Sequence, residues 1–145
     1  MTLGNKKTLM VPWLTTSLDE SFTSNLDKIK LKYDYVFGHF EICGFVYEAG
    51  IVAMNGLNPV DFFDNFKNTI SGHFHTRSEK SSDDRSINYV GTPYQLTFGD
   101  VGEEKGFWIF DLETDEKVFY KNNVSSEFIK LRSLEEIKNY DSLEN

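Results

Sequence analysis

The stretch that decides the fold is TISGHFH, residues 69–75, in which a short apolar run ends in Gly-His and continues into a His-x-His spacing. Residues 35–39, YVFGH, repeat the apolar run that ends in Gly-His. These two places hold all three histidines of the chain: His39, His73 and His75. Ligands bind beyond the carboxyl ends of strands in open α/β sheets, and imidazole is a common ligand for transition metals. The pattern therefore predicts a metal site at two strand ends.

A lone histidine at a strand end is more often a hydrogen-bonded edge residue than a ligand. The repeated Gly-His and the His-x-His spacing favour ligation for the set as a whole. Alternate residues of an extended segment point the same way, so His73 and His75 can approach neighbouring metal ions while Phe74 packs behind them. Gly38 and Gly72 lack a Cβ and leave room for a cation.

Outward from this stretch, the first half of the chain alternates between predicted strands and helices. The expected elements are a hairpin with strands at 1–3 and 8–11, a helix from Leu18 to Lys30, and a strand at 33–37. A second helix is expected to begin at Asn58-Pro59 and to bury Phe62, Phe63 and Phe66. A further strand is expected to begin at Thr69. This alternation indicates βαβ units and a parallel sheet.

The second half has a different character. The expected elements are strands at 87–90, 94–98, 106–112 and 117–120, a polar loop at 81–86, a candidate strand at 128–131 and a short helix at 133–137. Consecutive strands with short links favour an antiparallel meander. The predicted fold class is therefore α/β or α+β, with one domain over residues 1–124. Residues 125–145 are expected to form a linker or the start of a following domain.

Composition limits the setting and the partners. The 145 residues carry a formal net charge of −8, which argues against a broad basic face for DNA. A nuclease can still be acidic, because bound cations bring the positive charge. The single cysteine, Cys43, forms no internal disulfide, and residues 1–7 lack the apolar core of a secretion signal. No run is long enough to cross a membrane, so we expect a cytoplasmic location and no membrane partner.

Several segments together resemble the calcineurin-like metallophosphoesterases. They are VFGHFEICGF (36–45), SGHFHT (71–76), YVGTPYQLT (89–97), Gly99-Asp100 and KGFWIFD (105–111). Within that superfamily the chain is most similar to the SbcD-like branch of phage recombination endonucleases, from about Leu9 to Asn123. The resemblance implies a four-layer α/β/β/α sandwich in the complete form, with the mixed sheet and the meander described above.

The resemblance also implies a chemistry. His39 and His73 would ligate the second of two divalent metal ions and His75 the first, with manganese the expected metal. The implied reaction is phosphodiester hydrolysis on DNA at a two-metal site, in recombination and repair, beside an SbcC-like ABC ATPase subunit.

Three motifs that come earlier in the sequences of this family are missing from the chain: an Asp-x-His, a Gly-Asp with its bridging aspartate, and an Asn-His-Asp. The chain thus corresponds to the C-terminal half of a phosphoesterase domain. We expect it to be inactive alone, to hold at most one metal ion weakly, and to need either the missing N-terminal half or self-association as a homo-oligomer. An uncovered half-sandwich would expose apolar surface, which favours a dimer or a higher oligomer.

Four further residues are weaker candidates. Glu41 could orient a histidine ligand, or it could be a surface carboxylate. Arg77 could meet a phosphate, or it could pair with Glu79. Tyr94 and Gln95 fall where the family's loop approaches the site.

Two other functions stay open at this point. One is a non-catalytic binding module that docks an ATPase partner or a second copy of itself. The other is a small metalloprotein whose three histidines hold a single zinc or nickel ion.

Overall fold

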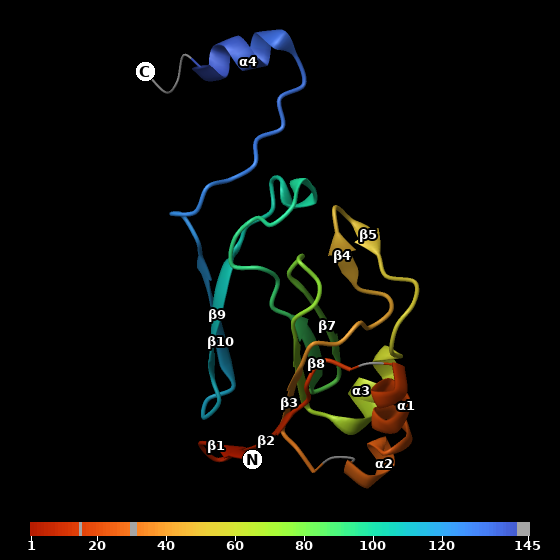
Figure 1. The fold of residues 1–145 in the computed structure, drawn as a ribbon. Helices are drawn as coiled ribbons and strands as arrows, with labels where there is room; N and C mark the ends of the chain where they lie inside the picture. Colours follow the sequence, from red (N-terminus) through yellow and green to blue (C-terminus); the bar gives the residue numbers. More distant parts are fainter. Residues whose placement is uncertain (15, 30–31, 142–145) are drawn as a thin grey trace.

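The computed structural model describes residues 1–14, 16–29 and 32–141. A six-stranded mixed sheet lies at its centre, with the strand order β1-β2-β3-β6-β8-β7 (Figure 1). Its strands are β1 (Thr2–Leu3), β2 (Lys6–Met10), β3 (Tyr35–Gly38), β6 (Asn68–Ser71), β7 (Ser78–Ser82) and β8 (Arg85–Tyr89). The inner strands β2, β3, β6 and β8 run parallel, while β1 and β7 pair antiparallel at the two edges. The predicted mixed α/β class is therefore confirmed.

Helices cover one face of this sheet: α1 (Thr16–Ser24), α2 (Leu26–Ile29) and α3 (Pro59–Asn65) (Figure 1). Helix α3 begins as predicted, because the Oδ1 atom of Asn58 accepts the amide hydrogen of Val60 at 3.0 Å and Pro59 holds the first helical position. Under it, the rings of Phe62 and Phe40 pack edge to face with centroids 4.9 Å apart. This aromatic layer forms the core between the helices and the sheet.

The helix predicted over 18–30 is instead two helices that meet at Asn25. The side-chain amide of Asn25 donates to the carbonyl oxygen of Ser21 at 2.7 Å. Such local bonds compete with helix continuation, which explains the break. Lys30, the last residue of the predicted helix, lies outside the described residues.

Two antiparallel ribbons accompany the main sheet: β4 (Val46–Glu48) with β5 (Ile51–Val52), and β9 (Gly106–Asp111) with β10 (Glu116–Lys121). The β9/β10 ribbon lies on the side of the sheet opposite the helices (Figure 1). Asp115, in its turn, accepts hydrogen bonds from the Lys6 ammonium and the Tyr35 hydroxyl, both at 2.8 Å. Farther along, the Lys117 ammonium donates to the Asn88 side chain at 2.7 Å. These contacts fasten the ribbon to the sheet.

The ribbon is apolar on both faces. Trp108 and Phe110 point to the sheet side, where they line one cavity with Phe37 and Ile70. On the outer face, the cross-strand pairs place four half-exposed apolar side chains together: Phe107, Ile109, Val118 and Tyr120. We call these four residues the outer ribbon face.

The predicted strand at 94–98 is wrong. Here the chain bends and enters a short 3-10 helix, η1 (Phe98–Asp100). The Asp100 carboxylate accepts the amide hydrogens of Leu96 and Thr97, both at 2.9 Å, so these amides cannot pair with a neighbouring strand. The predicted meander is therefore reduced to β9 and β10, and β8 pairs in parallel with β6 instead.

The polar loop predicted at 81–86 is also wrong, because these residues complete the β7/β8 hairpin. Its turn places Asp83 at φ 53°, a conformation that aspartate tolerates better than most residues. Strand β7 lies at the sheet edge and is largely exposed, so its polar composition is that of a solvated strand.

The C-terminal segment stands apart from the sheet. The helix predicted at 133–137 is confirmed and extends over α4 (Leu134–Asp141) (Figure 1). Residues 128–131 form no strand; the amide of Phe128 donates to the side-chain oxygen of Gln95 instead. The domain boundary at residue 124 stays a prediction. Across the residues described here, every helix is too short or too polar to span a bilayer.

Candidate metal centre

Three adjacent parallel strands bring aromatic rings to one edge of the sheet. Trp13 follows β2, His39 follows β3 and His73 follows β6. The ring centroids of the two histidines lie 5.1 Å apart with their planes at 84°, and Trp13 stacks on His39 at 4.5 Å. The carboxyl ends of these strands thus present two imidazoles side by side, at the edge where α/β sheets bind ligands.

The backbone near these rings is unusually constrained. A Cβ at Gly72 would lie 2.9 Å from the Nδ1 atom of His39, so glycine is needed for the close approach. His73 has φ 83°, in the left-handed region that favours glycine. Strained backbone of this kind persists where the surroundings enforce it, and it often occurs at functional sites.

The loop that carries His39 is fixed from below by buried polar groups. The Tyr89 hydroxyl accepts the Ile42 amide hydrogen at 3.0 Å and donates to the Phe40 carbonyl oxygen at 2.8 Å. The Phe40 amide donates to the Ser71 hydroxyl oxygen at 3.0 Å. Strands β6 and β8 therefore set the position of the loop after β3.

Two open cavities meet at His73 and Glu41, which line both. The first, of about 320 Å³, also contains His39 and Trp13; the second, of about 540 Å³, also contains His75. The Glu41 carboxylate lies 3.9 Å from the Nε2 atom of His73, so it is placed to influence that ring. Burial, together with the nearby His73, lowers the pKa of His39, which keeps this ring in the neutral form that binds metals.

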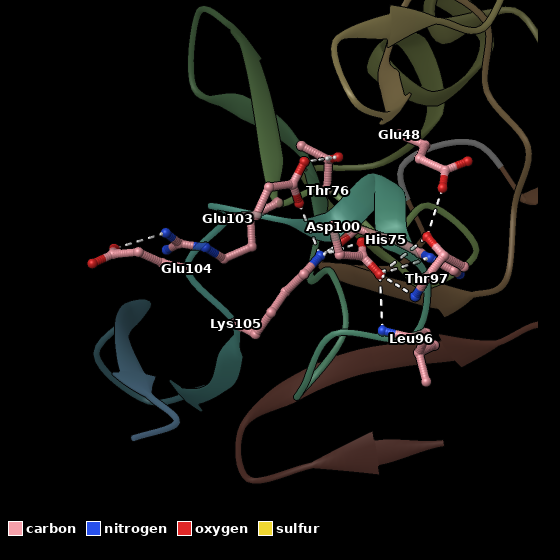
Figure 2. Close-up of polar contacts among 10 residues, drawn as sticks. Glu48, His75, Thr76, Leu96, Thr97, Asp100, Glu103, Glu104 and Lys105 are labelled. Carbon is pink, nitrogen blue, oxygen red and sulfur yellow. Dashed lines mark hydrogen bonds and ion pairs between the residues drawn. The ribbon is translucent and has the colours of Figure 1, made fainter. Parts of the chain in front are cut away.

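His75 faces a different partner (Figure 2). Its Nδ1 atom is buried and has no hydrogen-bond partner, while the Oδ2 atom of Asp100 lies 3.6 Å away. The structure therefore places His75 beside His73 on the larger cavity but turns one of its nitrogens toward a buried carboxylate.

Asp100 and Lys105 form a buried ion pair with 2.7 Å between the Oδ1 and Nζ atoms. Burial alone would raise the pKa of Asp100, but the Lys105 ammonium and the amides of Thr97 and Leu96 lower it to about 2. The sequence reasoning did not select this pair as site residues. Glu103 and Glu104 also lie between Asp100 and Lys105, so the sequence gives no reason to pair Lys105 with Asp100.

Three of the four weaker candidates lie elsewhere. Arg77 places its guanidinium 3.6 Å from the centroid of the Phe119 ring and 3.5 Å from the Glu104 carboxylate, so it packs against the ribbon. Tyr94 and Gln95 line a separate cavity with residues 124–128. The structure thus unites His39, His73, His75 and Glu41 around two adjoining cavities, away from these three residues.

Within the described ranges, no three histidine, cysteine, aspartate or glutamate side chains gather in a group that could hold a metal ion. His39 and His73 lie side by side there without a third side chain of these types to complete such a group.

Comparison with known proteins finds similarity to a phage exonuclease subunit. Over 117 residues, 80% of its length, it is 38% identical to exonuclease subunit 1 of Enterobacteria phage T4. The matched region covers 32% of that protein, so the chain spans about a third of the length of this relative. No family model matches the chain.

Proposed function

We propose that this chain contributes part of a two-metal phosphodiesterase site to a DNA nuclease of recombination and repair. The observation that carries the proposal is the pair of imidazoles of His39 and His73 at adjacent strand ends. Their ring centroids lie 5.1 Å apart, beside an open cavity. The similarity to a phage exonuclease subunit supports nuclease chemistry. In this proposal, the fold is the C-terminal part of a calcineurin-like metallophosphoesterase sandwich.

Imidazole donors suit a divalent transition metal, and manganese is the metal that the resemblance implies. His39 is held neutral by its lowered pKa, and Gly72 keeps the approach to its Nδ1 atom open. When bound, two such cations supply the charge that stabilises the transition state of phosphodiester hydrolysis.

In this scheme, the residues of this chain bind the metal ions and orient the metal-binding side chains. His39 and His73 would hold one cation, and His75 would contribute to the second from the neighbouring cavity. Glu41, 3.9 Å from His73, would orient that ring. The remaining donors, including a bridging carboxylate, would come from another polypeptide segment, because the described residues contain no complete ligand group. The isolated chain would therefore be inactive and hold at most one metal ion weakly.

Reconstitution tests this proposal. The chain would be mixed with a polypeptide corresponding to the part of exonuclease subunit 1 that it does not match, and cleavage of end-labelled DNA would be measured with and without Mn²⁺. We expect cleavage only when both polypeptides and the metal are present. His73→Ala should reduce cleavage to the level of either polypeptide alone, while Glu116→Ala on the ribbon should leave it unchanged. A stable complex without metal-dependent cleavage would reject the proposal.

A second candidate function is docking of a partner without catalysis. The outer ribbon face favours it, since Phe107, Ile109, Val118 and Tyr120 form a contiguous apolar patch. The partner in this case is an SbcC-like ABC ATPase subunit or a second copy of the chain. The test is capture of the purified ATPase by the chain. Capture that persists in the presence of EDTA and in the His73→Ala variant, but is lost in the Ile109→Glu variant, would favour docking over catalysis. The single-ion alternative gains no support, because the three histidines do not share one ligand group in the described residues.

A further inference from the structure

The side chain of His75 is oriented by a buried carboxylate. Its Nδ1 atom is shielded from solvent, and the Asp100 Oδ2 atom faces it at 3.6 Å, just beyond hydrogen-bond distance. An imidazole lone pair turned toward a carboxylate would meet only another lone pair, whereas an N–H turned toward it gains a favourable electrostatic attraction to the negative charge. The favourable arrangement therefore puts the proton on Nδ1.

Lys105 holds the two partners together. Its ammonium donates to the Asp100 Oδ1 atom at 2.7 Å, to the Glu103 carboxylate at 2.8 Å and to the backbone carbonyl oxygen of His75 at 2.9 Å (Figure 2). An ammonium has three hydrogens, so all its donors are used. One side chain thus fixes both the backbone of His75 and the carboxylate that faces its ring.

Asp100 is itself held in place from the other side. Its Oδ2 atom accepts the amide hydrogens of Leu96 and Thr97, each at 2.9 Å. The Thr97 hydroxyl in turn donates to Glu48 on β4 at 2.6 Å. The carboxylate therefore cannot turn away from His75 without breaking bonds at a fully buried position.

We infer that Asp100, clamped by Lys105, is the positioning residue of His75 and sets its tautomer with the proton on Nδ1. Nε2 is then the nitrogen whose lone pair is offered to the cavity that His75 and His73 share. A carboxylate that fixes a ligating histidine in this way tunes metal sites in general. Use of Nε2 as a metal donor rests on the proposed function, whereas the tautomer does not.

Nuclear magnetic resonance of the full chain without metal tests the inference directly. The ¹⁵N shifts of an imidazole and their couplings to the ring protons report which nitrogen is protonated, and His75→Gln identifies the His75 signals by their loss. We expect the Nδ1–H form for His75 at pH 8. A predominant Nε2–H form in the wild-type protein would overturn the inference, whatever any variant does.

Two matched variants separate positioning from a structural role. Asp100→Ala removes the oxygen that faces Nδ1, and we expect the folded variant to show a substantial Nε2–H population at His75. Asp111→Ala removes a carboxylate that also accepts two backbone amides, from Glu113 and Thr114, but touches no histidine. It should leave the His75 shifts unchanged. A folded Asp100→Ala variant with the wild-type tautomer would also overturn the inference.

Titration of the reconstituted complex with Mn²⁺ separates this inference from the proposed function. If both hold, Asp100→Ala should weaken Mn²⁺ binding by about 10- to 100-fold, while Asp111→Ala should leave it unchanged. A wild-type Nδ1–H tautomer with undetectable Mn²⁺ binding would reject the proposed function and support the positioning role of Asp100.

Discussion

The hydroxyl of Tyr89 on β8 accepts the amide hydrogen of Ile42 at 3.0 Å across 47 residues of sequence, and it donates to the Phe40 carbonyl oxygen at 2.8 Å. One buried phenol therefore holds both sides of Glu41 in the loop that follows His39. If the hydroxyl were removed, the buried Ile42 amide would lose the partner described here, and the Phe40 carbonyl oxygen would keep only the 3.4 Å bond from the Ser71 hydroxyl.

Tyr89→Phe should therefore destabilise the chain by about 1–3 kcal/mol, the usual penalty for unpaired buried polar groups. Urea denaturation followed by far-ultraviolet circular dichroism measures this change. Tyr120→Phe on the exposed outer ribbon face is the control and should stay within about 0.5 kcal/mol of the wild type. Equal stability of the two variants would show that the Tyr89 bonds do not hold the loop.

At residue 73, glycine should be tolerated better than alanine. The φ angle of 83° strains any residue with a Cβ, and glycine adopts it freely. We expect His73→Gly to be about 1 kcal/mol more stable than His73→Ala, while both lose reconstituted cleavage. Thermal denaturation of the two variants measures the difference. The reverse order of stability would mean that the loop relaxes once the imidazole is gone.

Acid should weaken the fold through Asp100. An ordinary aspartate has a pKa of 3.8, and that of Asp100 is lowered to about 2. A lowered pKa stabilises the folded state above the unfolded pKa, so this contribution is complete above about pH 5 and is lost as the pH falls toward 2. It amounts to about 2 kcal/mol.

Comparison of wild type and Asp100→Asn by urea denaturation between pH 6 and pH 2.5 checks this sign. The wild type should lose more stability than the variant on acidification, so the gap between them should narrow. Asp111→Asn, which changes an exposed carboxylate, is the control. The difference in stability between the wild type and this variant should change less with pH. A gap that is constant with pH would mean that Asp100 is not ionised in the folded protein at pH 6.

The outer ribbon face should drive self-association of the isolated chain. Its four apolar side chains are cross-strand neighbours, so a single charge among them disrupts the whole patch. Sedimentation velocity should show a concentration-dependent dimer or higher oligomer for the wild type and a monomer for Ile109→Glu. Val60→Glu, at an exposed apolar position on α3, should still associate. A monomeric wild type at high concentration would contradict this expectation.

The elements of the fold that could be predicted from the sequence are those specified by neighbouring residues in the chain. Asn58 and Pro59 specify the start of α3, and the apolar runs before His39 and His73 specify neighbouring strands. The break at Asn25 and the bend at Leu96 depend on single side-chain bonds to the backbone, which compete with periodic patterns and leave no periodic trace. Strand β7 was missed because an edge strand needs few apolar residues.

The candidate site was predictable to the same degree. Three histidines at two strand ends pointed to one edge of the sheet, and the structure brings His39 and His73 into contact there. Asp100 lies 25 residues after His75 on an irregular segment, so only tertiary packing reveals that it faces that ring. Arg77 lies away from the site because it packs on Phe119, a residue 42 positions later in the chain, and this contact is likewise visible only in the tertiary structure.

Because Trp13 stacks on His39, the intrinsic fluorescence of this tryptophan can report on the histidine pair. Trp13 is one of two tryptophans, and the other, Trp108, lies in the ribbon. Indole emission responds to the group stacked against it, so anything that engages the His39 imidazole will alter the brightness of Trp13. A Trp108→Phe chain would therefore carry a single fluorophore that reports events at the histidine pair in solution, without any attached dye.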